Sequence, residues 1–127
     1  MEAEQLINNF IKWFKSEIRV SPKLNSEGWQ EVILPILDNE NDYLEFYIKI
    51  DGEKVFLNDG GLSLMRIDLN KEELLKNRIE ILKNLTYFNG NLKIENNAVI
   101  VETNIKDFPI CLQLFVHAIL QFQFSEA

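Results

Sequence analysis

Residues 43–57 carry the pattern that decides the fold, and they read YLEFYIKIDGEKVFL. Apolar side chains take every second position in the first half of this stretch, at Leu44, Phe46, Ile48 and Ile50. This alternation predicts a strand with one buried face, because successive side chains of a strand point to opposite sides. The dipeptide Asp51-Gly52 then predicts a two-residue type I′ turn, since that turn needs residues that tolerate positive φ. We therefore expect residues 43–50 and 54–57 to form an antiparallel hairpin.

The segments around this hairpin predict an α+β domain. Apolar residues at three- and four-residue steps predict an amphipathic helix over residues 2–18. Pro35 suits an edge strand or a strand end within the extended segment 29–37, because proline cannot donate to a sheet ladder. Further along, the pattern predicts a helix over 70–85, short strands at 92–94 and 98–102, and a helix over 105–124. We expect one domain over 1–127, with an N-terminal helix, an antiparallel sheet of about four to five strands and helices packed on one face.

The last predicted helix, 105–124, is apolar on nearly all sides. Its polar side chains form one narrow stripe of Gln113, His117 and Gln121. A helix this apolar must be covered on most of its surface. Two interpretations follow: a central core helix that lies on the sheet, or an interface through which residues 105–124 build a homodimer.

Length and composition predict a soluble cytoplasmic domain. The chain has 127 residues, of which 46% are hydrophobic, and this is ample for one core. No apolar run approaches the roughly 20 residues that cross a bilayer, so we expect no membrane association. The N-terminal residues contain no signal-peptide cleavage pattern, and the lone Cys111 fits a reducing compartment.

The whole net charge of −7 comes from residues 27–59. That segment holds nine acidic residues against two lysines, whereas the remainder holds 11 of each sign. A concentrated acidic surface repels nucleic acid and attracts basic partners. We therefore expect no direct contact with nucleic acid, and a protein partner with a basic surface.

The hairpin strand also predicts where that partner binds. Tyr43, Glu45, Tyr47 and Lys49 share the strand face opposite the apolar one. Aromatic side chains beside carboxylates are good anchors for an Arg- or Lys-rich surface. The predicted partner-binding residues are Asp38, Glu40, Asp42, Tyr43, Glu45, Tyr47 and Asp59. The docking hypothesis requires that these carboxylates gather on a single patch of the folded surface.

Catalytic chemistry is less well supported by the residues. The alternative function is a metal-dependent hydrolase that uses Asp38, Asp42, Glu45 and Asp59 as oxygen ligands for Mg²⁺ or Ca²⁺. A nuclease of this kind also needs a lysine two residues after the second acid, but Tyr47 stands at that step from Glu45. His117 and Cys111 lie about 120° apart around their helix, too far to form a nucleophile–base pair. We therefore predict no catalytic residue, no metal ligand and no cofactor.

Residues 29–64 also resemble a known family. The matching elements are Trp29, Leu34-Pro35-Ile36-Leu37-Asp38, the strand from Asn41 to Lys49, and the turn from Leu57 to Leu64. They resemble the domain of unknown function 1828 family, over roughly 27–122 and most specifically over 35–61. That family occurs in bacteria and on phages and other mobile elements. In this chain Gly60 stands where the family usually has a second acid after Asp59.

The charge and the resemblance together predict a non-enzymatic interaction protein, associated with a phage or mobile element. Its acidic face would bind a basic partner such as a nucleic-acid-binding defence protein, and the chain would act as an inhibitor by occupying the groove that phosphates normally fill.

Overall fold

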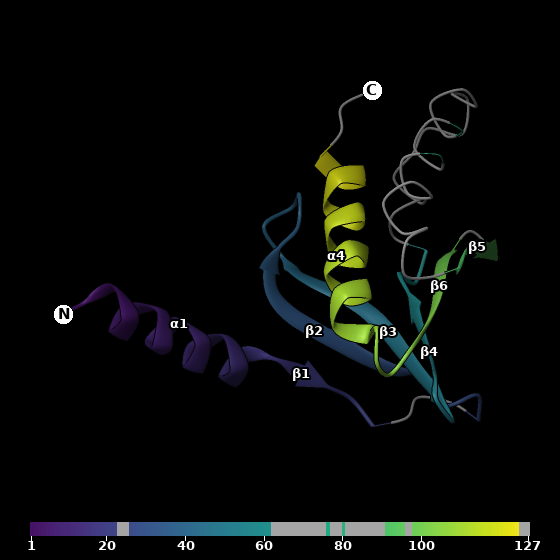
Figure 1. Cartoon of the computed structure of the whole chain (residues 1–127). Coiled ribbons are helices and arrows are strands. Elements are labelled where there is room, and N and C mark those ends of the chain that lie inside the picture. Colours follow the sequence, from purple (N-terminus) through teal and green to yellow (C-terminus); the bar gives the residue numbers. More distant parts are fainter. Residues whose placement is uncertain (23–25, 62–75, 77–79, 81–90, 96–97, 125–127) are drawn as a thin grey trace.

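The computed structural model describes residues 1–22, 26–61, 76, 80, 91–95 and 98–124. Within these ranges, two helices accompany one six-stranded sheet (Figure 1). The elements are α1 (Ala3–Glu17), β1 (Arg19–Val20), β2 (Gln30–Leu37), β3 (Tyr43–Asp51), β4 (Lys54–Asn58), β5 (Asn91–Glu95), β6 (Ala98–Asn104) and α4 (Phe108–Phe124). The predicted helix over 70–85 lies outside the described residues, except for two isolated positions.

The sheet confirms the predicted α+β class and adds a strand. Its order is β1-β2-β3-β4-β6-β5, and every neighbouring pair is antiparallel. The additional strand is β1, which pairs Arg19 with Ile33 and Val20 with Val32. Two residues are too short to show an alternating pattern, so the sequence did not predict this strand.

The central hairpin forms as predicted, but its turn is displaced by one residue. Asp51 pairs with Lys54, so Gly52 and Glu53 are the turn residues. Gly52 has a φ of 62°, and it is the one positive φ in this turn. Glycine in the first central position is typical of a type II′ turn, which replaces the predicted type I′ turn.

The sequence predicted Pro35 in an edge strand or at a strand end. It lies near the end of β2, which is an internal strand of the sheet. β2 has a neighbour on each side, β1 and β3. However, β1 reaches only Val32 and Ile33, and the β2–β3 register shifts between Leu34 and Leu37. Pro35 is therefore tolerated because the ladder is irregular on one side of it and has ended on the other.

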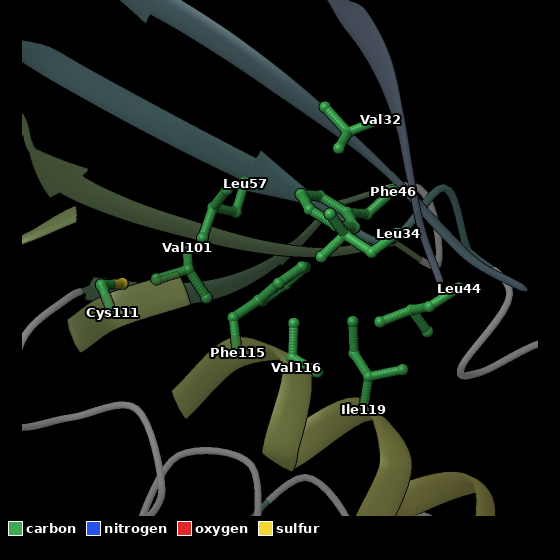
Figure 2. Packing of buried hydrophobic residues seen from close by; sticks show 10 residues of the cluster. All are labelled: Val32, Leu34, Leu44, Phe46, Leu57, Val101, Cys111, Phe115, Val116 and Ile119. Atoms are coloured by element: carbon green, nitrogen blue, oxygen red, sulfur yellow. The ribbon is translucent and has the colours of Figure 1, made fainter. Parts of the chain in front are cut away.

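The core lies between the sheet and α4. The rings of Phe46 on β3 and Phe115 on α4 meet edge to face, with centroids 5.6 Å apart at 71°. Figure 2 shows these two rings at the centre of the buried cluster, whose members are Val32, Leu34, Leu44, Phe46, Leu57, Val101, Cys111, Phe115, Val116 and Ile119. Since one side of α4 is buried in this cluster, the core-helix interpretation is confirmed.

Cys111 is a buried member of this cluster. Burial raises the pKa of its thiol, and the charge of Asp107 raises it further, whereas a hydrogen bond with Thr103 lowers it in part.

The N-terminal helix differs from the usual amphipathic helix in that only the end of its apolar stripe, at Phe14 and Ile18, lies against the rest of the described structure. Every residue from Met1 to Trp13 is exposed, and Phe14 is partly buried. Figure 1 shows α1 extending away from the sheet at the β1 end. The helix is capped at its N-terminus, where the backbone N–H of Glu2 donates to Oε1 of Gln5 at 2.9 Å. Neither α1 nor α4 is long and apolar enough to cross a membrane.

Candidate functional site

The register of the sheet divides its side chains between two faces. Val32, Phe46 and Leu57 face α4 and are buried. The opposite side, which we call the open face, carries Glu31, Ile33, Tyr43, Glu45, Tyr47, Lys49, Phe56 and Asn58. On this face Tyr47 lies directly across from Glu31 on β2 and from Asn58 on β4. Residues directly opposite one another in an antiparallel pair have neighbouring side chains.

Tyr47 is the aromatic centre of the open face. Its side chain is partly buried, and partial burial raises the pKa of its hydroxyl. The carboxylates of Glu31 and Glu45 raise the pKa further, because a phenolate would be repelled by both. Tyr47 therefore presents a neutral ring and hydroxyl close to two negative charges.

The acidic loop between β2 and β3 has a defined geometry. Oδ1 of Asp38 accepts hydrogen bonds from the backbone N–H groups of Glu40 at 2.8 Å and Asp42 at 3.0 Å. Asn41 adopts a φ of 62°, which asparagine tolerates better than most residues. Asn39 also donates to the carbonyl of Gln123 at the end of α4, at 3.4 Å. These contacts leave the side chains of Glu40 and Asp42 exposed.

The loop continues directly into the open face. The Tyr43 hydroxyl lies 3.5 Å from Oε1 of Glu17 on α1. Two residues further along β3, Glu45 is exposed. We call the combined surface the acidic end, and its members are Glu31, Asp38, Glu40, Asp42, Tyr43, Glu45 and Tyr47. Arg19 lies at its border, where Nη1 donates to the carbonyls of Ser16 and Ile18, and Nη2 approaches Glu17 at 4.0 Å.

Not all of the excess acid belongs to this surface. Asp51 and Glu53 are exposed at the β3–β4 turn, about 27 Å from the acidic loop at the rise of an extended strand. Between these two ends, Lys49 places Nζ 5.8 Å from the Trp29 ring centroid and 5.9 Å from that of Phe56. The predicted single patch is therefore divided, and the acidic end holds one part of it.

Asp59 is buried, although the sequence predicted an exposed acid at this position. Its side chain is 2% exposed. Oδ1 accepts hydrogen bonds from the backbone N–H of Gly61 at 2.9 Å and of Val99 at 2.8 Å. The Asp59 N–H in turn donates to the Val99 carbonyl at 3.2 Å. Asp59 thus joins the end of β4 to β6, and it is not available to a protein partner.

The burial of Asp59 also argues against the metal-dependent hydrolase that was the alternative function. The ligand set of Asp38, Asp42, Glu45 and Asp59 is not assembled, because Asp59 is buried against β6 while Glu45 is exposed on the open face. Within the described ranges, no three histidine, cysteine or acidic side chains are grouped so that they could hold a metal ion. Cys111 and His117 also differ in environment, since Cys111 is buried and His117 is exposed.

One member of the acidic end, Glu31, was not among the residues predicted from the sequence. The buried positions Val32 and Leu34 on β2 place Glu31 and Ile33 on the other side of the strand. The sequence contains this alternation, but Pro35 interrupts the segment, so no strand face was predicted for it. The position of Glu31 beside Tyr47 required the β2–β3 register.

Fold and surface together define a small α+β domain whose antiparallel sheet packs α4 on one face. The acidic end extends from the other face of the sheet into the loop between β2 and β3. The family model described as "Domain of unknown function DUF1828" matches residues 34–122. The chain belongs to this family. The match includes the acidic loop, β3, Asp59 and most of α4, whereas α1, β1 and Glu31 precede it. No curated protein and no solved structure was found to match the chain.

Gly60 lies against the ring of Tyr47 in the acidic end. Its φ is 71°, and a Cβ at this position would lie 2.7 Å from Cε2 of Tyr47. We expect Gly60→Ala to lower the free energy of unfolding by about 1–3 kcal/mol, through the unfavourable φ and the contact with the ring. Chemical denaturation measures this loss. In a Tyr47→Ala background, Gly60→Ala is expected to cost less, because the steric part disappears; equal costs in both backgrounds would contradict the contact.

Proposed function

We propose that the chain is a non-enzymatic interaction protein that binds a basic protein partner through its acidic end. One observation carries the proposal: the neutral Tyr47 ring has Glu31 directly across from it on β2 and Glu45 two residues before it on the same face of β3. Tyrosine is enriched among residues that dominate binding energy, and flanking carboxylates select arginine and lysine. The preformed acidic loop extends this surface without an ordering cost.

The partner class follows from the charge. Carboxylates repel the phosphate backbone, so the surface does not suit nucleic acid itself. A protein that binds nucleic acid presents the complementary basic groove, and an acidic end could occupy that groove in place of phosphate. The phage or mobile-element setting belongs to this proposal, with a bacterial defence protein as the target. A cytoplasmic location also belongs to it, and agrees with a single buried thiol.

Charge reversal tests this function. A partner is first recovered by affinity capture from the native host and identified by mass spectrometry, and its Kd is then measured by calorimetry. We expect Glu31→Lys combined with Glu45→Lys to weaken binding by about 100-fold or more, because two attractions become repulsions beside Tyr47. Raising the salt concentration should weaken binding of the unmodified chain but much less that of the variant.

The matched control changes the same charge at the other end of β3. Asp51→Lys combined with Glu53→Lys alters net charge equally but lies away from the acidic end. Its Kd should stay within a few-fold of the original. If both variants bind equally weakly, only the overall charge matters; if both bind normally, the acidic end is not the binding site.

A further inference from the structure

The exposed stripe of α1 gathers five exposed large apolar side chains on one helix, and the proposed function does not use them. Leu6, Ile7, Phe10 and Ile11 are 57%, 58%, 54% and 55% exposed, and Trp13 is 45% exposed. We call these five residues the arm. The Phe10 ring lies at its centre, 6.1 Å from the Trp13 ring and 5.9 Å from the Phe14 ring. An isolated helix of 15 residues is marginal in water, so a stable α1 requires something to cover the arm.

A second apolar surface lies close to the base of α1. A groove of about 710 Å³ runs between β2 and α4. Its apolar lining includes Leu34, Ile36, Leu112, Leu114 and Leu120, and the polar residues Gln113 and His117 also line it. This volume is within the range of grooves that accept apolar ligands or side chains. The outer side of α4 is therefore not closed by the described residues of its own chain.

The arm cannot fill the groove of its own chain in this conformation. Phe14 and Ile18, which end the apolar stripe of α1, already line the groove. The arm residues precede them on a straight helix that extends away from the sheet (Figure 1). The apolar surface is thus continuous from the groove to the arm, and a chain that lies across both would cover it completely.

We propose that a second copy of this chain covers it, in a two-fold dimer in which each arm lies in the groove of the other copy. Self-complementary surfaces close by two-fold symmetry, and each chain supplies one arm and one groove. Each arm residue contributes roughly 100 Å², about half of a large apolar side chain, so the five residues on each of two arms bury roughly 1,000 Å² before the groove surface is counted. With the lining of the two grooves added, the total enters the range of specific interfaces.

The polar face of α1 distinguishes this occupant from a lipid surface. It carries Glu2, Glu4, Lys12, Lys15 and Glu17, with acids in slight excess. Helices that lie on membranes usually carry a basic polar face instead. The dimer does not use Glu31, Glu45 or Tyr47 of the acidic end, because these residues lie on the open face and the groove adjoins the α4 side of the sheet. The homodimer predicted through residues 105–124 would therefore use α4 as half of the interface, with α1 as the other half.

The test uses the chain of 127 residues and two variants that change exposed residues. Phe10→Glu places a charge at the centre of the arm, whereas Gln113→Glu with His117→Glu places two charges in the groove. Analytical ultracentrifugation should show a dimer for the unmodified chain. Each variant should raise the dimer Kd by at least about 30-fold, the loss typical of a dominant interface residue. Asn8→Glu introduces the same side chain on the polar face of α1 and should leave the Kd unchanged.

Mixing the two variants gives the decisive result. The groove variant retains a normal arm, and the arm variant retains a normal groove. A mixed dimer therefore keeps one intact arm–groove contact, whereas both contacts are impaired in a dimer of either variant, so the mixture should dimerise more tightly than either variant alone. Circular dichroism checks that both variants remain folded. As a second measurement, a bifunctional maleimide should join a Phe10→Cys chain to a Gln113→Cys chain, while the buried Cys111 stays unmodified.

Three results would overturn the dimer. A monomeric unmodified chain at the highest soluble concentration would exclude it, whether or not that monomer binds vesicles of anionic lipid. Dimerisation that depends on the arm but not on the groove would show that two arms pair with each other. A mixture that dimerises no more tightly than either variant alone, together with no cross-link between the Phe10→Cys and Gln113→Cys chains, would show that the arm and the groove do not meet.

Discussion

Phe115→Ala is expected to lower the free energy of unfolding by about 3–5 kcal/mol, which is a large part of the stability of a domain of this size. Phe115 is 1% exposed and meets the ring of Phe46, which is 0% exposed. Removing the ring loses its burial and leaves a cavity that the strands and α4 can collapse only in part. Urea denaturation followed by circular dichroism measures the loss, and the variant should be partly unfolded at 37 °C.

The matched control is Ile110→Ala on the same helix. Ile110 is 57% exposed, so its truncation should cost less than about 1 kcal/mol. The pairing of the rings can be tested separately with Phe46→Leu. The Phe46–Phe115 interaction should give a coupling energy of about 0.5–1.5 kcal/mol in a double-mutant cycle. If Phe115→Ala cost no more than Ile110→Ala, α4 would not be the core helix of this domain.

Asp59→Ala is expected to lower the free energy of unfolding by about 2–4 kcal/mol. The substitution removes the acceptor of two backbone N–H groups, those of Gly61 and Val99, and the Val99 bond is buried. An unpaired buried donor loses its hydrogen bond to water without replacement, which makes each one costly. Denaturation measures the total, and faster amide hydrogen exchange at Val99 would locate the damage.

Two further substitutions show whether the acceptor matters or only the charge. Asp59→Asn keeps a side-chain oxygen in place and should recover at least half of the loss. Asp51→Ala removes an exposed carboxylate nearby in sequence and should change stability by less than about 0.5 kcal/mol. Equal effects of Asp59→Ala and Asp51→Ala would show that Asp59 does not join β4 to β6.

The polar face of β3 is the part of the candidate site that the pattern within one strand could predict. Alternation alone placed Tyr43, Glu45 and Tyr47 on one face, and the structure agrees, because Leu44 and Phe46 are buried on the other. Glu31 joins Tyr47 through a cross-strand register that includes an irregularity near Pro35. Nothing within β2 itself specifies that register, so the pairing could not be predicted from either strand separately.

Periodicity in the sequence determined the hairpin of β3 and β4, the helices α1 and α4, and the side of each that is apolar. These features follow from repeats of two and of three to four residues, which depend only on neighbours along the chain. Tertiary structure alone decided which apolar surfaces are covered and which acids are exposed. Val99, 40 residues away, converts Asp59 from a turn acid into a buried acceptor, and α4 covers the sheet but leaves the arm of α1 exposed. Burial is a property of what packs on a residue, and distant parts of the chain supply that packing.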